Sequence, residues 1–156
     1  MTINVTIEVP KGSRNKYELD KNSGNIVLDR VLHSSVHYPA CYGFIPDSLY
    51  ADGDPLDVMV ITRFPTVPGC VIPSRPIGVL KMIDTGDADE KIIAVPEKDP
   101  YHEKWNNIED VPAALKNEIE EFFKTYKNLE KGKSVEIKGW GDKDEAEKII
   151  NESIQK

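Results

Sequence analysis

Asp52-Gly53-Asp54-Pro55-Leu56-Asp57-Val58-Met59-Val60-Ile61 joins three carboxylates directly to an apolar run. The apolar run predicts a buried strand over residues 57–62. Two like charges about 4 Å apart repel by roughly 4 kcal/mol at an effective dielectric near 20, so a chain that folds them together needs a cation. Ligands that are all oxygen favour a hard cation such as Mg²⁺. The stretch therefore predicts a metal site at the start of a core strand.

The local geometry of this stretch supports a shared site without requiring one. In extended backbone Asp52 and Asp54 face the same way, and the bend at Pro55 lets Asp57 turn back toward them. A Ca²⁺ loop of the EF-hand type does not fit, because its sixth position should be Gly and its twelfth Glu, whereas the chain has Asp57 and Arg63 there. A solvated acidic turn stays open as the plainer interpretation.

A second acidic run, Asp84-Thr85-Gly86-Asp87-Ala88-Asp89-Glu90, lies between two further expected strands at residues 77–83 and 91–95. Alone, this run is typical of a charged hairpin loop. Two acidic runs that both follow core strands can deliver carboxylates to one end of a barrel, enough to hold two or more cations. Two metals about 3.5–4 Å apart recur in enzymes that carry out displacement at phosphorus.

Displacement at phosphorus also requires donors for the anionic oxygens. Arginine offers a planar fork that matches phosphate, and lysine offers a point charge. Each candidate can equally be a surface cation or a packed tyrosine, and periodicity does not show that the candidates converge. They are Lys16, Arg30, Lys91, Lys127, Tyr38, Tyr42 and Tyr126.

Strands dominate the first two thirds of the chain. Apolar residues alternate with polar ones at the N-terminal end, and Lys21-Asn22-Ser23-Gly24 is typical of a hairpin turn. Seven prolines between Pro39 and Pro76 predict that the strands there are short and separated by fixed turns, a pattern that suits a small closed barrel. Beyond the strands already given, strands are expected at residues 3–9, 16–20, 25–28 and 134–137.

Helices are expected late in the chain. An amphipathic helix is predicted from an N-cap at Asp110, with Pro112 in its first turn, to a stop at Gly132. A short final helix is predicted after a cap at Asp142. Together with the strands, these helices predict an α+β fold in a single domain spanning residues 1–156, with a barrel first and helices packed against it.

Composition restricts the partners and the compartment. The net charge of −7 disfavours binding to nucleic acid or to an anionic membrane, since both favour basic surfaces. No apolar stretch approaches the ~18 residues of a membrane span, and the first residues do not resemble a signal peptide. Cys41 and Cys70 fit no metal-ligand spacing and are expected as reduced thiols in a cytoplasmic protein.

Several other chemistries lack their motifs. The histidines have no paired spacing for zinc, and the chain has no P-loop for nucleotide phosphates. The carboxylates of the two acidic runs could serve a metal-dependent phosphatase or a nucleotide hydrolase. An OB-type barrel for single-stranded nucleic acid is disfavoured by the acidic charge, and a Ca²⁺-binding structural module by the loop spacing.

The chain resembles a known family, the soluble family I inorganic pyrophosphatases. Asp52-Gly53-Asp54-Pro55-Leu56-Asp57-Val58 fits the family signature D-x-D-P-x-D-V. Several other motifs occur in the family's order, so the resemblance covers most of the chain, from about residue 5 to Trp140. These motifs are Ile7-Glu8-Val9-Pro10, Lys16-Tyr17-Glu18, Asp29-Arg30, Tyr38-Pro39-x-x-Tyr42-Gly43, Gly78-Val79-Leu80-Lys81-Met82-x-Asp84 and Tyr126-Lys127-x-Leu129-Glu130.

The resemblance implies a five-stranded OB-like closed barrel with additional strands and flanking helices. It implies hydrolysis of pyrophosphate to two phosphates with several Mg²⁺ ions, and Asp54 as the general base for a metal-activated water. The implied inner metal ligands are Asp52, Asp57 and Asp89, with Asp57 bridging two metals. Asp84 would hold a metal carried by the substrate, and Glu8 and Glu18 would support metals or waters. The implied phosphate ligands are Lys16, Arg30, Tyr42, Lys91, Tyr126 and Lys127.

The chain departs from the family pattern at Thr85, where many relatives carry a second acid. The ligand set for the substrate-borne metal is therefore open at this position. The short length resembles the prokaryotic members, which implies a homo-oligomer, usually a hexamer.

Overall fold

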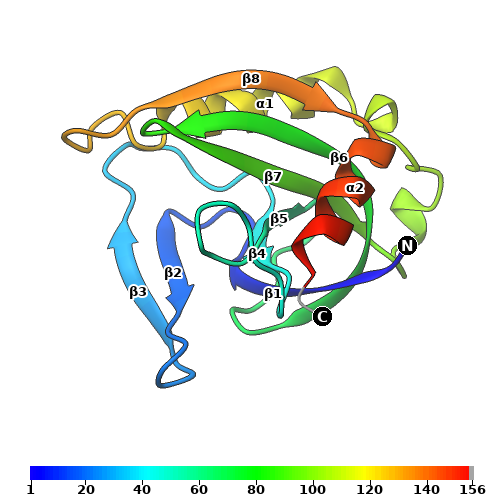
Figure 1. Ribbon diagram of the computed structural model, residues 1–156, viewed down its shortest axis with the longest axis horizontal. Coiled ribbons are helices and arrows are strands. Elements are labelled where there is room, and N and C mark those ends of the chain that lie inside the picture. Colours follow the sequence, from blue (N-terminus) through cyan, green and yellow to red (C-terminus); the bar gives the residue numbers. More distant parts are fainter. Residues whose placement is uncertain (155–156) are drawn as a thin grey trace.

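A ring of five strands forms the centre of the molecule (Figure 1). The computed structural model describes residues 1–154, so the last two residues of the predicted domain lie outside the described part. The ring runs β1-β4-β5-β7-β6 and closes because β6 pairs with β1. The closed ring confirms the predicted barrel. Its strands are β1 (Ile3–Val9), β4 (Cys41–Phe44), β5 (Asp57–Val60), β6 (Val71–Asp84) and β7 (Asp87–Pro96).

Three strands lie outside the ring. β8 (Val135–Gly141) adds to the outer edge of β6. β2 (Asn15–Leu19) and β3 (Ile26–Val31) form a separate two-stranded sheet around the predicted hairpin turn. The neighbours in the ring are antiparallel except for β5 and β7, which pair in parallel with Val58 opposite Ile92. That parallel pair brings the ends of the two acidic segments side by side.

The length of β6 contradicts the prediction of short strands in the proline-rich region. β6 runs for 14 residues and continues through Pro73 and Pro76. The register shifts between Pro76 and Gly78, where β6 pairs with β7. A bulge accommodates a proline because the ladder is already interrupted there. The bend lets one strand pair with β1 through its first part and with β8 through its second.

The first long helix, α1 (Ala113–Thr125), is shorter than predicted. Asp110 is not its N-cap, because this side chain accepts the backbone N–H groups of Asn106 and Asn107 and closes the 3₁₀ turn η2 (Ile108–Asp110). A second 3₁₀ turn, η1 (Pro100–His102), precedes it. α1 also ends before the predicted stop at Gly132, and Leu129, which lies beyond its last residue, is 68% exposed.

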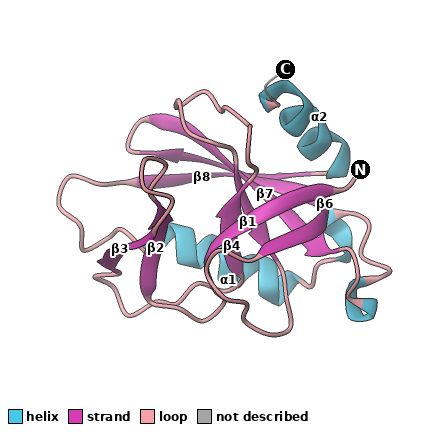
Figure 2. Cartoon of the chain, turned by 90° about the horizontal axis from the view of Figure 1, so that it is seen from below, coloured by secondary structure: helices cyan, strands magenta, loops and turns pink. Residues whose placement is uncertain are grey.

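The final helix, α2 (Lys143–Ser153), begins as predicted, with the Asp142 carboxylate accepting the Glu145 N–H at 2.9 Å. Figure 2 shows α1 and α2 on different sides of the barrel. Each helix covers a different part of the core, α2 through Ala146 and Ile150. None of the helices in residues 1–154 is long and apolar enough to cross a membrane.

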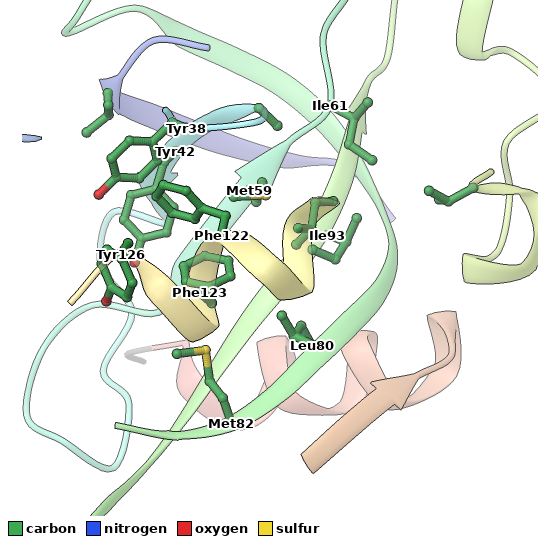
Figure 3. Close-up of a cluster of buried hydrophobic side chains, with 14 of the residues drawn as sticks. Tyr38, Tyr42, Met59, Ile61, Leu80, Met82, Ile93, Phe122, Phe123 and Tyr126 are labelled. Atoms are coloured by element: carbon green, nitrogen blue, oxygen red, sulfur yellow. The ribbon is translucent and has the colours of Figure 1, made fainter. Parts of the chain in front are cut away.

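Aromatic side chains join α1 to the barrel (Figure 3). The ring of Phe122 lies 4.5 Å from that of Tyr38 and 5.2 Å from that of Tyr126, measured between centroids. Tyr42 packs against Phe123 in the same cluster, with centroids 6.3 Å apart. This buried wall fixes Tyr42 and Tyr126 at the edge of the cavity described next.

Candidate active site

A cavity of about 290 Å³ opens at one end of the barrel. Seven carboxylates and four lysines line it, so the lining carries a net charge of −3 when all are ionised. Twelve of the thirteen site residues implied by the family resemblance lie here together. They are Glu8, Lys16, Glu18, Tyr42, Asp52, Asp54, Asp57, Asp84, Asp89, Lys91, Tyr126 and Lys127.

These side chains come from segments far apart in the chain. β1, β2, β4 and β5 each contribute residues, β2 along most of its length, and the loop before β5 contributes Asp52 and Asp54. The hairpin of β6 and β7 contributes Asp84, Asp89 and Lys91. Both acidic segments therefore reach one cavity, as the sequence predicted, even though residues 52 and 89 are 37 positions apart in the chain.

Arg30 is the exception, because it does not line the cavity. Its guanidinium forms ion pairs with Asp29 and with Glu130, whose Oε1 lies 3.1 Å from Nε. Lys16 lies on the cavity side of this cluster, with its Nζ 3.5 Å from the same Asp29. Tyr38, the remaining phenol among the candidates, is 2% exposed and packs behind Tyr42.

Lys91 occupies the floor of the cavity and is 3% exposed. Its ammonium donates to the Tyr42 hydroxyl at 2.7 Å and to Asp57 Oδ2 at 2.8 Å, and lies 3.0 Å from Asp89 Oδ2. Burial alone would lower the pKa of Lys91, but the nearby carboxylates outweigh it and hold the pKa well above its usual range. The group is therefore a permanent cation that links β5 to β7.

Lys127 is a second cation paired with a carboxylate, at the wall of the cavity. Its Nζ donates to Asp84 Oδ2 at 2.6 Å, which ties the end of α1 to the β6–β7 hairpin. Burial alone would raise the pKa of Asp84, but the hydrogen bond and charge of Lys127 outweigh it and lower that pKa. Asp84 is therefore an ionised carboxylate with a resident ammonium partner.

Two other carboxylates in the cavity, Glu8 and Asp89, have raised pKa values because they are buried. Burial raises the pKa of Glu8 to about 7, against a smaller opposing effect of the Leu19 N–H, which donates to its Oε2 at 2.8 Å. Burial likewise raises the pKa of Asp89, although Lys91 opposes that shift. Buried carboxylates that favour the protonated form are stabilised by an added cation.

The donor set suits a hard divalent cation, because it consists of carboxylates that outnumber the lysines. In residues 1–154, however, no three Asp, Glu, His or Cys side chains already converge at metal-binding distance. Instead, Lys91 lies between Asp57 and Asp89, and Lys127 pairs with Asp84. Bound metals would therefore compete with these ammonium groups for the same oxygens.

Five residues that line the cavity were not among the predicted site residues. Tyr17 lies between two predicted residues on β2, so the motif Lys16-Tyr17-Glu18 was a usable signal. Lys21 lies in the turn after β2, and nothing local distinguishes it from an ordinary turn lysine. The other three are Leu19, Phe44 and Pro55.

Comparison with known proteins assigns the family. The family model described as Inorganic pyrophosphatase matches residues 5–156. The chain belongs to the inorganic pyrophosphatase family. An inorganic pyrophosphatase of Synechocystis sp. is 56% identical over 153 residues, which cover 98% of this chain and 90% of that protein.

Solved structures of inorganic pyrophosphatases share the whole fold. The Helicobacter pylori structure matches with a TM-score of 0.96 at 42% identity, covering 98% of this chain and 91% of that one. The Thermus thermophilus structure matches with a TM-score of 0.96 at 45% identity, covering 98% and 89%. These matches confirm the family resemblance and the OB-like α+β fold. The roles of individual side chains stay predictions.

Proposed function

We propose that this protein hydrolyses inorganic pyrophosphate to two phosphates in the carboxylate-lined cavity, with several Mg²⁺ ions. The observation that carries the proposal is the convergence of seven carboxylates with Lys16, Lys91 and Lys127 in a chain of the inorganic pyrophosphatase family. The substrate is an anion, and the lining has a net charge of −3. Added cations are therefore needed before the anion can enter.

The family resemblance suggests different roles for these carboxylates. Asp52, Asp57 and Asp89 would be the inner metal ligands. Asp84 would hold the metal that arrives with the substrate, and Glu8 and Glu18 would support metals or waters. When bound, Mg²⁺ would lower the pKa of a water molecule and neutralise negative charge on the phosphates.

Asp54 would act as the general base. It is exposed on the loop before β5 and lines the cavity, so its carboxylate can take a proton from an attacking water. It differs from Asp57 and Asp84, which are ion-paired to lysines. A carboxylate without a resident ammonium partner is the better proton acceptor, since an adjacent cation lowers its basicity.

The cations and phenols would hold the phosphate oxygens. Lys16 and Lys127 lie at the cavity wall, where Lys127 could exchange Asp84 for a phosphate oxygen. The buried Lys91 ammonium, with the Tyr42 hydroxyl, would stabilise negative charge that develops on the leaving phosphate. Tyr126 would donate its hydroxyl from the end of α1. Arg30 would reach phosphate only after a rearrangement of its pair with Asp29.

The assembly and location follow the same resemblance. We propose a cytoplasmic homo-oligomer, with a hexamer as the expected form, and a single catalytic domain. Nucleic acid and membranes are not expected as partners, in keeping with the net charge of −7.

The reaction is tested by measuring phosphate release from pyrophosphate with Mg²⁺ and after chelation. We expect rapid release that stops when the metal is removed and returns when Mg²⁺ is restored. Parallel assays with ATP and with a phosphate monoester separate this function from a general phosphatase. Equal or faster release from either of these substrates would contradict the proposal.

A further inference from the structure

The loop between β4 and β5 carries Asp52 and Asp54, and its tip is held by few contacts. Residues 51–54 are all exposed. The base of the loop is secured by Ser48, which is buried, donates to the Ile45 carbonyl at 2.6 Å and accepts the Leu56 N–H at 2.9 Å. These bonds fix where the loop leaves and rejoins the barrel. They do not fix the tip.

Tyr50 supplies the connection at the tip. Its backbone N–H donates to the Asp54 carbonyl at 2.8 Å, and its carbonyl accepts the Gly53 N–H at 3.0 Å. Within the turn so closed, the Asp54 N–H donates to Asp52 Oδ1 at 2.9 Å. The tip therefore moves with Tyr50 as a unit, and the position of this one residue sets the position of both carboxylates.

The Tyr50 side chain ties that unit to the barrel. Its hydroxyl donates to Glu90 Oε1 at 2.5 Å, across 40 residues of sequence. Glu90 lies on β7, paired with Lys81 of β6, between the cavity residues Asp89 and Lys91. Neither Tyr50 nor Glu90 lines the cavity.

We propose that Tyr50 and Glu90 form a strut that positions the Asp52–Asp54 tip beside β7. Both are positioning residues that act through Asp52 and Asp54. Their catalytic purpose rests on the proposed pyrophosphate hydrolysis. The strut sets the separation between the two acidic segments, one of which is an exposed loop and the other a paired strand.

Loss of the strut should affect metal binding and turnover more than folding. The barrel does not depend on the tip, whose residues are exposed, but productive geometry at a reacting centre tolerates little displacement. Groups that orient metal ligands from outside the site commonly change metal affinity or activity by 10-fold or more. The expected signature is a higher Mg²⁺ requirement and a lower kcat, with little change in the KM for magnesium pyrophosphate.

Three single variants and one control test the strut. Tyr50→Phe removes only the hydroxyl, and Glu90→Ala removes the acceptor. Glu90→Gln keeps a side-chain carbonyl that can accept the bond and should retain most of the wild-type behaviour. Tyr101→Phe makes the same chemical change at a tyrosine that is 64% exposed and lies outside the cavity, and serves as the matched control.

For Tyr50→Phe and Glu90→Ala we expect kcat to fall about 10-fold, the Mg²⁺ concentration for half-maximal rate to rise, and Tm to change by less than about 3 °C. The double variant Tyr50→Phe/Glu90→Ala should be no worse than either single variant. Tyr101→Phe should match wild type. Unchanged kcat and Mg²⁺ requirement in Tyr50→Phe would overturn the positioning role. If Glu90→Gln is as impaired as Glu90→Ala, the charge matters rather than the bond, and the strut is overturned.

Amide hydrogen exchange of the metal-free proteins gives a readout that does not depend on activity. Exchange in residues 49–56 should be several-fold faster in Tyr50→Phe than in wild type, and unchanged in Tyr101→Phe. Equal exchange in Tyr50→Phe and wild type would overturn the strut. A wild-type protein that releases no phosphate would overturn the proposed function, and the exchange rates alone would then support or overturn the strut.

Discussion

The two acidic segments of this protein have similar composition but different construction. The segment over residues 52–57 is an exposed loop tip that leads into β5. The segment over residues 84–90 is a tight hairpin in which only Thr85 and Gly86 lie outside the paired strands, both with positive φ, at 48° and 88°. The first segment places Asp52 and Asp54 on an exposed tip and Asp57 at the start of β5, whereas the second places its carboxylates on the paired strands β6 and β7.

The two segments also differ in how their charge is balanced. In the hairpin, Asp84 pairs with Lys127, and Asp89 lies beside Lys91. At the loop tip, the described structure gives Asp52 and Asp54 no ion pair with a lysine or arginine. The hairpin carboxylates therefore lie beside ammonium groups with which a bound metal would have to compete, whereas the proposed base Asp54 and the proposed metal ligand Asp52 have no such ammonium partner among the described residues.

The largest expected effect is a loss of kcat when the proposed base at the loop tip is removed, with no change in the fold. Asp54→Asn removes the proposed base, and general-base catalysis contributes about 10²- to 10⁴-fold, so kcat should fall by at least about 100-fold. The variant should keep the wild-type Tm, because the side chain is exposed. Steady-state phosphate release and thermal unfolding measure the two effects.

Asp144→Asn is the matched control for the Asp54 variant. Asp144 is exposed in the first turn of α2 and lies outside the cavity, so its rate should match wild type. Near-wild-type activity in Asp54→Asn would remove Asp54 from the role of base.

The next largest effect is a loss of stability when Lys91, the buried cation between β5 and β7, is replaced. Lys91→Met leaves the carboxylates of Asp57 and Asp89 together in the cavity floor without their shared ammonium. Breaking a buried ion pair by removing one partner costs about 3–5 kcal/mol, and we expect the free energy of unfolding at neutral pH to fall by that order. Mg²⁺ should restore part of the loss, because it supplies positive charge to the same oxygens. Denaturant unfolding with and without Mg²⁺ measures both.

Lys138→Met gives the comparison for a surface pair. Lys138 pairs with Glu136, with side chains 50% and 66% exposed, and exposed pairs contribute less than about 1 kcal/mol. A similar loss of stability in the Lys91 and Lys138 variants would contradict the assignment of Lys91 as the central cation.

The pH dependence of stability should reveal the raised pKa of Glu8. Glu8 has its pKa raised from 4.5 to about 7 in the fold, so the folded state holds a proton that the unfolded state releases between those values. Its contribution to stability is therefore full below pH 4.5 and is lost as pH rises through 7, by about 3 kcal/mol in total for the metal-free protein. The measurement is the free energy of unfolding against pH for wild type and Glu8→Gln, under chelation.

The difference between those two curves isolates Glu8 from the other titrating groups. The difference should shrink when Mg²⁺ is present, because a bound cation favours the ionised carboxylate. Parallel curves for wild type and Glu8→Gln in chelator would show that Glu8 titrates near its ordinary pKa.

Local signals in the sequence account for the features that were predicted correctly. The hairpin around residues 21–24 and the cap at Asp142 depend on residues a few positions apart, so the sequence contains the whole interaction. The boundaries of α1 were wrong because Asp110 had a competing use in η2. Pro76 was misleading because a register shift beside it, which depends on the pairing of β6 with β7, lets the strand continue, and Pro73 pairs in register with Asn4 of β1.

The site was predicted as a set of residues but not as an arrangement. Motifs identified twelve residues that do converge. They did not show that Lys91 joins Asp57 to Asp89, since that contact depends on the parallel register of β5 and β7. Nor did they show that Arg30 is turned toward Glu130, outside the cavity. Both contacts join segments far apart in the sequence, so no local pattern encodes them.

The smallest effect offers a direct comparison of the two segments with one chemical change. Gly53 at the loop tip and Gly86 in the hairpin have nearly equal φ, at +87° and +88°, and an added Cβ meets nothing within 4 Å at either position. Alanine at either site therefore costs only the left-handed strain of about 1–2 kcal/mol. In the hairpin this strain is borne by the paired strands, so Gly86→Ala should lower the free energy of unfolding by about 1 kcal/mol. The exposed tip can relax, so Gly53→Ala should lower it less and reduce kcat more. Equal changes in stability and rate would show that the tip is as rigid as the hairpin.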